Sequence, residues 1–485
     1  MRTVLFPQDF VWGAASSALQ IEGAASPAER GESIWDTFCR REGCVHNGDN
    51  VTIACDHIAR MPSDVALLKQ IGLKAYRFSI NWPRVMPDGV GAINTAGLDF
   101  YDRLVDELLA ADIAPWLTLY HWELPQALFN RGGWLNRSIV SWFADYTDAV
   151  VRKLGDRVKH WMTLNEPQIF LWLGMSKGLH APGLKLSTRE VLLATHHALM
   201  AHGRAVQVVR AQTPVGTRIG WAPVGKVDYP ATDTAADVAA ARRMTFAIDK
   251  PDLWNNTWYA DPVCLGHYPE DGLRAFGSDA PRIAPGDMEL IKQPLDFYGL
   301  NIYAGTPTRA TADGGASLPW PVGHARNALN WPIAPPSLRW GPRFIWERYK
   351  LPIVITENGM PNLDWVDLDG RVRDPQRIDY TRRYLFELAA AIDDGVPVQG
   401  YFHWSLMDNF EWAEGYKDRF GLVHVDYATQ KRTLKDSAYW YRGVIRSNGQ
   451  ALTLSADAAM QLAEPTVVAD VEEFSPPPVG ASMRS

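Results

Sequence analysis

Two glutamates, Glu166 and Glu357, stand where apolar runs give way to loops in this sequence. Glu166 lies in the segment TLNEP at residues 163–167, and Glu357 lies in ITENG at residues 355–359. A carboxylate placed this way sits at the rim of a sheet or barrel, and two on different strands can face one another across a cleft. A pair of carboxyl groups is the minimum that an enzyme needs to cleave a glycosidic bond. A single strand-end glutamate is more often a solvated rim residue, so the pair needs support from its surroundings.

Short apolar runs alternate with segments of helical periodicity along the chain. Asn94 and Ser63 are predicted N-caps, the helix after Ser63 running to Gly72, and the series from Ser187 to Glu190 forms a capping box. Parallel strands need such helical crossovers. The predicted strands cover residues 11–15, 75–80, 114–120, 161–164, 218–222, 296–301, 353–356 and 398–402.

Eight strand–helix units predict an α/β fold, a single (β/α)8 TIM barrel with elaborated βα loops. The alternative is an open doubly wound sheet, although no Gly-x-Gly-x-x-Gly follows the first strand to indicate a dinucleotide site. The intervals 221–295 and 304–350 are rich in Pro, Gly and Trp and are predicted to be the long loops. We assign residues 1–448 to the catalytic domain and residues 449–485 to a loosely ordered C-terminal tail.

The composition of the chain limits which binding partners and which cellular compartment we expect. The net charge of −7, from 48 basic and 55 acidic residues, gives no reason to expect a nucleic acid or an anionic membrane. We find no secretory signal and no apolar run of about 20 residues, so we predict a cytoplasmic protein without a membrane span. Cys39, Cys44 and Cys55 lie near His46 and His57, but there is no Cys-x-x-Cys pair. We therefore expect no metal and no cofactor.

Polar and aromatic residues follow seven of the eight predicted strands; only the fifth gives little. Because barrel enzymes build their sites at the carboxyl ends of the strands, this coincidence favours one site over scattered rim residues. Arg77 near one carboxylate would hold that group ionised. Amides, an imidazole and indoles suit the hydroxyls and faces of a sugar ring. The residues at these ends are Gln20, Glu22, Arg77, His121, Trp122, Glu123, Asn165, Glu166, Asn301, Tyr303, Glu357, Asn358, His403, Trp404 and 408–412.

Motifs in this order resemble the β-glucosidases of glycoside hydrolase family 1. The resemblance extends from residue 10 to residue 437 and includes FVWG at 10–13, SIWD at 33–36, YRFS at 76–79, HAPG at 180–183 and WSLMDNFEW at 404–412. It implies that Glu166 is the acid/base and Glu357 the nucleophile of a retaining mechanism. Retention requires the two carboxyl groups to be only about 5–5.5 Å apart.

The resemblance also implies roles for the surrounding residues. Arg77 and Tyr303 match positions that hold the nucleophile, and Asn165 matches the residue that binds the sugar 2-hydroxyl. Trp331 resembles the aromatic residue at the entrance, where the leaving group rests. Asn81 and Glu123 depart from the expected Ser and Asp, and residues 312–343 are less familiar. The positions that match the remaining substrate-binding set are Gln20, His121, Trp404, Glu411, Trp412 and Phe420.

These residues imply a β-glucosidase that releases terminal β-D-glucose from aryl glucosides and short oligosaccharides through a covalent glycosyl-enzyme. β-Galactosidase, β-fucosidase and transglycosylation activities are expected as side reactions. A charged Glu411 would repel a 6-phosphate, which favours unphosphorylated glycosides. The rival classes are a sugar-binding barrel without catalysis, which needs neither Glu166 nor Glu357, and a metal-dependent barrel hydrolase, for which only His121 and His403 lie at strand ends. The expected partner is a small glycoside, and self-association into a homo-oligomer stays open.

Overall fold

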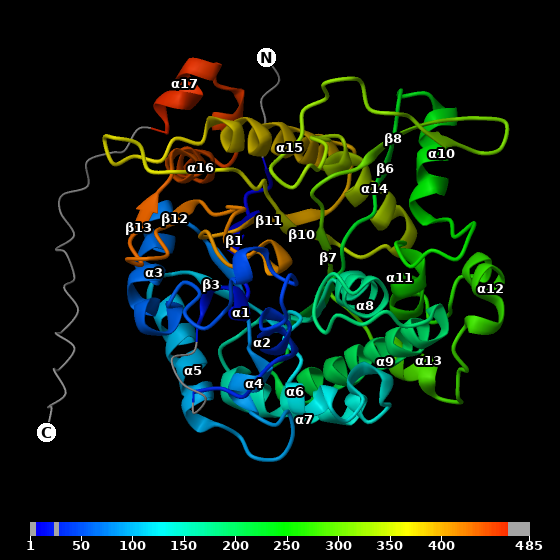
Figure 1. Cartoon of the computed structure of the whole chain (residues 1–485). Coiled ribbons are helices and arrows are strands. Elements are labelled where there is room, and N and C mark those ends of the chain that lie inside the picture. The colour runs from blue at the N-terminus through cyan, green and yellow to red at the C-terminus, as the bar shows by residue number, and fades with distance from the viewer. Residues whose placement is uncertain (1–5, 24–28, 464–485) are drawn as a thin grey trace, which may run out of the picture.

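The computed structural model describes residues 6–23 and 29–463 of the chain. Its centre is an eight-stranded sheet of parallel strands in the order β5-β4-β3-β2-β1-β11-β10-β7, seen near the middle of Figure 1. The strands are β1 (Val11–Ala15), β2 (Ala75–Ser79), β3 (Ala114–Tyr120), β4 (His160–Asn165), β5 (Arg218–Ala222), β7 (Tyr298–Asn301), β10 (Ile353–Asn358) and β11 (Val398–Trp404).

The two edges of this sheet, β5 and β7, meet and bring the barrel close to closure. The Asp296 amide donates to the Ile219 carbonyl over 2.8 Å, and the Asp296 carboxylate accepts from the Ile219 amide over 2.7 Å. Farther along, the Asn301 amide donates to the Pro223 carbonyl over 3.1 Å. The predicted TIM barrel is therefore confirmed, and the open doubly wound alternative is excluded.

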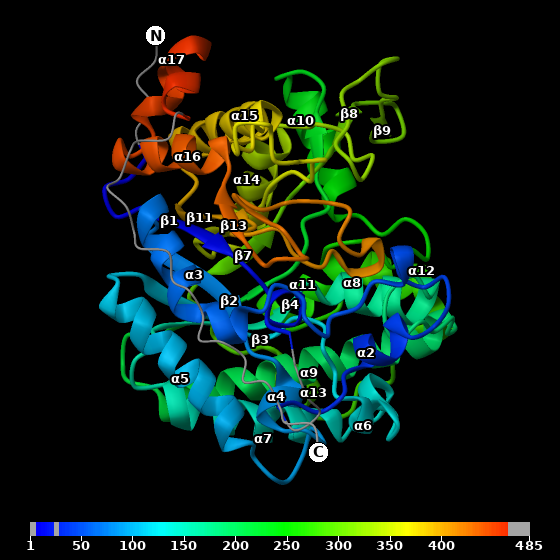
Figure 2. The same cartoon turned by 60° about the vertical axis from the view of Figure 1, so that its left-hand side comes forward.

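Helices surround the barrel, as the two views in Figures 1 and 2 show. The longer ones are α3 (His57–Ile71), α5 (Thr95–Ala110), α7 (Ile139–Leu154), α9 (Thr188–Gln212), α14 (Ser337–Tyr349), α15 (Pro375–Asp393) and α16 (Asp436–Arg446). Short helices in the loops include α1 (Ala18–Ile21), α2 (Ile34–Cys39), α4 (Trp82–Val85), α6 (Gln126–Phe129), η2 (Gly133–Leu135), α8 (Pro167–Leu171) and the π-helix η3 (Trp172–Lys177).

Two of the three predicted helix starts are correct. Ser187 and Glu190 form the reciprocal capping box of α9, and Asn94 is the N-cap residue of α5. The start at Ser63 is wrong, because α3 begins six residues earlier at His57 and contains Pro62. Proline is favoured in the first turn of a helix, but Pro62 lies beyond it, because one full turn of α3 precedes this residue. The predicted end at Gly72 is correct, with that residue in the left-handed conformation at φ 81°.

The strands that carry the candidate residues extend farther than their apolar runs. Glu357 lies inside β10, where, after a register shift beyond Ile355, it is paired with Asn301 of β7, and Asn358 is paired with His403 of β11. The prediction ended this strand at Thr356 because hydrophobicity marks only the part that faces apolar neighbours. The backbone ladder continues into the polar rim, so these side chains start from a fixed frame.

The long intervals contain regular structure. The first holds the helices α10 (Ala235–Phe246), α11 (Thr257–Cys264), α12 (Glu270–Phe276) and α13 (Asp287–Ile291). A small sheet of β6 (Asp228–Pro230), β8 (Thr306–Arg309) and β9 (Ala316–Ser317) joins the two intervals and lies beside α10 in Figure 1. These insertions are ordered extensions of the barrel.

The inside of the barrel is filled by side chains from alternate strands. Trp116 packs against Phe297 and Phe402 with ring centroids 5.5 and 5.0 Å apart. Met162 and Val354, both fully buried, belong to the same cluster. This packed interior is the floor beneath the carboxyl ends of the strands, so a ligand can approach only from the rim.

The first part of the predicted tail is packed against the barrel rather than loosely attached. Residues Gln450–Thr453 form the 3-10 helix η6, and α17 follows at Ala456–Gln461. Leu452 is fully buried, and its carbonyl accepts a hydrogen bond of 3.0 Å from Arg382 on α15. The remaining tail lies outside the described residues, and the boundary at 448 stays a prediction. Within the described chain, no helix is both long enough and apolar enough to cross a membrane.

Candidate active site

Glu357 is held by hydrogen-bond donors from strand β2 and from the loop after β7. Arg77 of β2 donates from Nη1 to Oε1 over 2.6 Å, and the Tyr303 hydroxyl donates to Oε2 over 2.6 Å. Tyr303 is fixed in turn, because its carbonyl accepts from the hydroxyls of Tyr380 and Tyr384 on α15 over 3.0 and 2.9 Å. Both carboxylate oxygens of Glu357 therefore have a set direction.

Two asparagines connect Glu357 and its arginine to the second carboxylate. The Asn165 Oδ1 atom accepts from Arg77 Nη2 over 2.7 Å and from Asn301 Nδ2 over 3.1 Å. The same Asn301 amide donates to Glu166 Oε1 over 2.8 Å, and its Oδ1 accepts from Thr356 over 2.6 Å. The two glutamates thus belong to one hydrogen-bonded cluster.

Glu166 sits at a sharp bend between β4 and α8. Its backbone is left-handed, with φ 43° and ψ 65°, and it is the N-cap residue of α8, with Pro167 next. Its amide donates to the Ala222 carbonyl of β5 over 2.8 Å. A left-handed conformation is uncommon for a residue with a side chain, so the bend aims this carboxyl over the barrel instead of along the strand.

The surroundings push the two carboxyl groups apart in proton affinity. Burial and the negative charge of Glu357 together raise the pKa of Glu166 to about 8, against one hydrogen bond from Asn301 and the charge of Arg77. Burial also raises the pKa of Glu357, but the Arg77 charge and the Tyr303 hydrogen bond oppose the rise. When one proton is shared between the two, it therefore resides on Glu166.

Aromatic rings line one side of the rim. The His121 ring stacks near Trp404 and Trp412, with centroids 5.5 and 5.9 Å apart and an interplanar angle of 16° in both cases. His121 Nε2 lies 3.0 Å from Asn165 Nδ2, and burial lowers the pKa of His121 well below its usual value. A neutral imidazole here presents hydrogen-bonding atoms without adding a positive charge.

Gln20 and Glu411 lie on the same side but differ in their bonding. The Gln20 amide donates to Asn409 Oδ1 over 3.0 Å and to the Phe410 carbonyl over 2.7 Å, so it also anchors the loop that carries Glu411. Glu411 Oε2 is shielded from solvent and has no partner among the described residues. Burial and the nearby acidic group of Asp418 raise the pKa of Glu411 well above its usual value. The raised pKa opposes ionisation of Glu411, and the predicted charge of this group stays a prediction.

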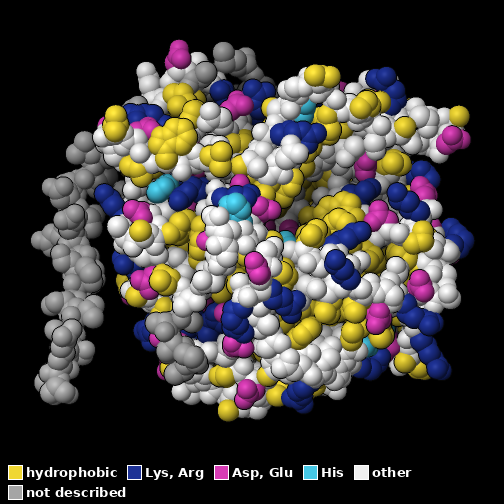
Figure 3. Space-filling view, viewed as in Figure 1, with side chains coloured by type: hydrophobic (Ala, Val, Ile, Leu, Met, Phe, Trp, Pro, Cys, Tyr) yellow, Lys and Arg dark blue, Asp and Glu magenta, His cyan; other side chains and the backbone are white. Residues whose placement is uncertain are grey.

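Three aromatic residues stand together beside Glu357. Trp331, half-buried, packs against Tyr303 at 5.4 Å between ring centroids, and Phe420 lies 6.1 Å from Tyr303 and 6.3 Å from Trp331. Figure 3 shows the face hollowed near its centre, with hydrophobic side chains on the rim. The structure therefore brings the predicted site residues to one end of the barrel.

Comparison with known proteins decides the family. A sequence model described as Glycosyl hydrolase family 1 matches residues 2–450. The chain belongs to glycosyl hydrolase family 1. The "Beta-glucosidase A" of Thermotoga maritima is 43% identical over 451 residues, which cover 93% of this chain and 99% of the relative. The "Aryl-phospho-beta-D-glucosidase BglC" of Bacillus subtilis is 40% identical over 479 residues, covering 92% and 98%.

A solved structure agrees with the family assignment. The T. maritima β-glucosidase in complex with glucoimidazole superposes with a TM-score of 0.84 at 42% identity, covering 92% of this chain and 99% of that chain. The predicted resemblance is confirmed, and the chain is a glycoside hydrolase of family 1. A sugar-binding barrel without catalysis and a metal-dependent hydrolase are both set aside by this membership.

Sequence reasoning missed the connecting residues of this family 1 site. Asn301, which bonds both Asn165 and Glu166, was noted only as a strand end. Trp122, which donates to the Asn165 carbonyl over 3.0 Å, was likewise noted only as a strand-end residue, and Thr356, which orients the Asn301 amide, was not singled out. Their position at strand ends was the available signal. Their function as links depends on side-chain directions that a single sequence does not reveal.

Other candidate residues lie apart from the carboxylate cluster. Glu123 is buried behind His121 and accepts from its backbone amide over 3.3 Å; burial raises the pKa of Glu123 to about 8. His403 is fully buried, where its ring is adjacent to Tyr441. Within residues 6–23 and 29–463, no group of three His, Cys, Asp or Glu residues is arranged to hold a metal ion. The described cysteines are all free, and Cys55 donates to the Asp408 carbonyl over 3.1 Å.

Proposed function

We propose that this chain is a retaining β-glucosidase in which Glu357 is the nucleophile and Glu166 the acid/base. The observation that carries the proposal is the unequal support of the two carboxyl groups. Glu357 accepts from a guanidinium and a phenol over 2.6 Å each. Glu166 accepts only from the neutral Asn301 amide among the described residues. One group is prepared to attack as an anion and the other to donate a proton.

The reaction then proceeds in two displacements. Glu357 attacks the anomeric carbon while Glu166 gives its proton to the departing oxygen, forming a covalent glycosyl-enzyme. Esterification removes the negative charge of Glu357, so the proton affinity of Glu166 falls and the group becomes a base. It then takes a proton from water, which attacks the anomeric carbon and releases the sugar with its configuration retained.

The remaining site residues are proposed to bind the two parts of the substrate. Gln20, His121, Trp404, Glu411 and Trp412 would contact the glucosyl ring, and Asn165 its 2-hydroxyl. An indole offers a broad apolar face and one N–H donor, which suits a ring whose C–H faces stack while its hydroxyls bond. Trp331 and Phe420 stand beside Tyr303 and would hold the leaving group. The relatives named β-glucosidases support the choice of glucose.

Rescue by azide tests the two roles. Glu357→Gly should abolish hydrolysis, and azide should then yield the α-glycosyl azide because it attacks from the face the nucleophile occupied. Glu166→Ala should be rescued on activated substrates with a β-configured product. A β-azide from Glu357→Gly would show that Glu357 is not the nucleophile. An inverted first product from the wild type, observed by NMR, would reject the retaining mechanism.

A 6-phosphoglucosidase is the second candidate, because the B. subtilis relative carries that name. Repulsion by a charged Glu411 does not exclude it, since burial raises the pKa of that carboxyl. The environment still disfavours a phosphate. Lys417 near this end is occupied by Glu414 and Asp418, each at 2.5 Å, and burial of a phosphate beside several acidic groups is costly.

A panel of aryl β-glycosides separates these substrates. We expect kcat/KM to be highest for the glucoside, lower for the galactoside and fucoside, and lowest for the 6-phosphoglucoside. A higher value for the 6-phosphoglucoside would reverse the choice. Transglycosylation is tested in the same assay at high substrate concentration, where free glucose should fall below released aglycone. The cytoplasmic location and any homo-oligomer stay predictions.

A further inference from the structure

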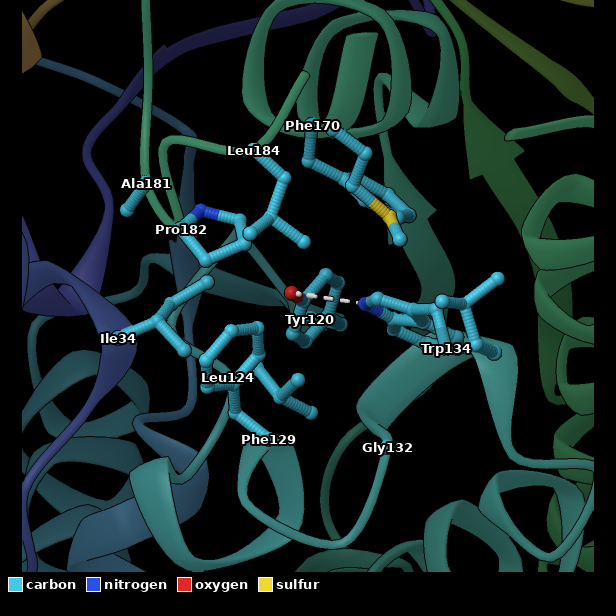
Figure 4. A pocket seen from close by; sticks show the side chains of 12 residues that line it. Ile34, Tyr120, Leu124, Phe129, Gly132, Trp134, Phe170, Ala181, Pro182 and Leu184 are labelled. Carbon is cyan, nitrogen blue, oxygen red and sulfur yellow. Dashed lines mark hydrogen bonds between the residues drawn. The ribbon is translucent and has the colours of Figure 1, made fainter. Parts of the chain in front are cut away.

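An apolar pocket lies outside the barrel wall, behind strand β3. It has a volume of about 190 Å³ and is lined by residues from β3, α2, α6, η2, α8, η3 and the segment 181–184. Figure 4 shows Tyr120, Trp134 and Phe170 directed toward its centre, with Leu124 and Leu184 at its sides. The lining is thus built from many separate segments around one space.

The pocket is distinct from the carboxylate cluster. The His121 ring lies beside Trp404 and Trp412 of the active site, whereas Tyr120, its neighbour in sequence, contacts a different set of rings. The Tyr120 ring packs between strand and outer layer, 5.2 Å from Trp134 and 5.1 Å from Phe170 between centroids. No residue that we placed in the active site lines this pocket.

Its chemistry is apolar except at one point. Trp134 Nε1 donates to the Tyr120 hydroxyl over 3.4 Å, a long contact, drawn as the dashed line in Figure 4. Among the described residues, no acceptor lies within hydrogen-bonding distance of the Tyr120 hydroxyl hydrogen. Burial raises the pKa of Tyr120 well above its usual value, so this group stays an O–H donor. A buried donor without a partner is costly, and a ligand oxygen would satisfy it.

The size of the pocket limits what can enter. A cavity of about 150 Å³ lined by apolar side chains stays dry and holds benzene, so the space here accepts one aromatic ring with a short substituent. Aromatic walls favour a ring that contacts them by face or edge. The Tyr120 hydroxyl acts as a donor here, so the matching substituent of the ligand is a hydrogen-bond acceptor that carries no hydrogen of its own.

We propose that this pocket binds a single-ring aromatic molecule bearing one acceptor oxygen, an aryl ether or aryl carbonyl. The ring lies among Trp134, Phe170 and Leu184, and the oxygen accepts from the Tyr120 hydroxyl. Leu184 and Phe129 are partly exposed, so the ligand enters between them. This binding does not depend on the proposed hydrolysis, because none of the carboxylate cluster takes part.

Titration of the full chain with 4-fluoroanisole, followed by fluorine NMR, tests the proposal. We expect saturable one-site binding that is weaker for 4-fluoro-ethylbenzene, which has the same shape without the oxygen. Tyr120→Phe should weaken the binding of 4-fluoroanisole by roughly fivefold, which corresponds to the loss of one hydrogen bond, and should leave the binding of 4-fluoro-ethylbenzene unchanged. Equal affinity of wild type and Tyr120→Phe for the ether would overturn the assigned donor.

A second test fills the pocket with a larger side chain and compares that variant with a matched control outside the pocket. Leu184→Trp should abolish binding, whereas Leu179→Trp, at a residue that is 59% exposed on the same loop, should not. Leu135→Trp is a second filling variant if thermal unfolding shows the first to be misfolded. Trp331→Ala should leave binding intact. Loss of binding in Trp331→Ala, survival in both filling variants, or no saturable binding in the wild type would each overturn the proposal.

Discussion

Two clusters of buried charge lie near the same end of this barrel and differ in their balance. In the first, which we call the ion cluster, Asp364, Asp374 and Asp408 face three cations. Lys435 Nζ contacts Asp364 at 2.5 Å and Asp408 at 2.6 Å. Arg377 bonds both Asp364 and Asp374, and Arg419 contacts Asp408 at 2.7 Å. Positive and negative groups are equal in number.

The carboxylate cluster of the active site is out of balance. Glu166, Glu357 and Glu411 influence one another electrostatically, and Arg77 is the guanidinium that contacts this group, at Glu357. Burial raises the pKa of all three carboxyl groups. In the ion cluster, by contrast, Arg377 and Lys435 lower the pKa of Asp364 to about 2 against its burial, although burial still raises that of Asp374.

The difference in charge balance distinguishes a cluster that stabilises the fold from one that serves catalysis. Matched ions hold loops together: the ion cluster joins the segment after β10, the segment after β11 and helix α15. Unmatched buried carboxyl groups have raised pKa values, and a raised pKa is what a general acid needs. Their excess charge should lower stability, since sites built for chemistry are commonly less stable than their neutral replacements.

The largest effect should come from Glu357→Gln. We expect kcat for an aryl β-glucoside to fall on the order of 10⁴-fold or more, as for removal of other covalent nucleophiles. The melting temperature should stay level or rise, because one of three mutually repelling buried carboxyl groups is gone. Steady-state kinetics and calorimetry measure both. Activity within tenfold of wild type would remove Glu357 from its proposed role, and a large fall in melting temperature would break the contrast between the clusters.

Arg377→Met should give the largest loss of stability. It leaves two buried aspartates without their shared cation, which costs about 3–5 kcal/mol in free energy of unfolding. Arg383→Met is the matched control on the same helix. Its pair with Asp379 is exposed on both sides, at 61% and 60%, and should be worth less than about 1 kcal/mol. Denaturant unfolding of the two variants compares them, and equal losses would contradict the structural role of the ion cluster.

The alkaline limb of activity should report Glu166. This group must be protonated to donate, so kcat/KM should fall as the pH rises through the pKa of about 8. In Glu357→Gln the pKa of Glu166 should drop, because the neighbouring negative charge that raises it is removed. Carbon NMR of labelled glutamates follows that titration directly. An unchanged Glu166 pKa would show that the two carboxyl groups are not coupled.

The two clusters should also affect stability at opposite ends of the pH range. The folded pKa of Glu166 is about 8, above its unfolded value, so the folded state binds the extra proton and its contribution to stability falls as the pH rises toward 8. The folded pKa of Asp364 is about 2, below its unfolded value, so its contribution is lost as the pH falls toward 2. Glu166→Gln should flatten only the alkaline loss in a series of unfolding measurements.

Neutralising Glu411 should have the smallest effect. Glu411→Gln replaces a carboxyl whose pKa burial raises well above its usual value with a neutral amide of the same shape, so stability should change by less than about 1 kcal/mol. KM for glucosides should rise only a few-fold. Asp408→Asn is the control in the ion cluster, where Arg419 would lose its carboxylate partner and Lys435 one of two, so the free energy of unfolding should fall by about 3 kcal/mol or more. A larger stability loss for Glu411→Gln would mean that its carboxyl is ionised.

The sequence revealed the parts of the fold that depend on repeating patterns. The predicted strands match those observed because continuous apolar runs mark strands buried on both faces, and Glu166 and Glu357 could be placed at strand ends from this alone. The extent of the strands into the rim was not visible, because Asn165 and Glu357 are polar. The false helix start at Ser63 shows a related limit, since a serine can cap a helix or lie inside one, and the local sequence does not decide which.

Side-chain connections and proton affinities could not be predicted from one sequence. Asn301 links both carboxyl groups only because β7 and β10 pair in a register that no local pattern reveals. The raised pKa of Glu411 could not be predicted because it depends on burial and on Asp418, which lies in a different part of the loop. The packing of Leu452 against α15 was missed for a related reason: a short apolar stretch near a terminus has no period long enough to indicate its partner.

Tyr380 and Tyr384 of α15, which hold the Tyr303 carbonyl, make the outer layer part of the chemistry. Their rings stack 4.0 Å apart, and the same helix carries Arg377 of the ion cluster. A disturbance of α15 therefore reaches Glu357 through the Tyr303 hydroxyl. The acid limb of a pH–rate profile, which follows the ionisation of Glu357, would then report changes in how α15 packs against the barrel.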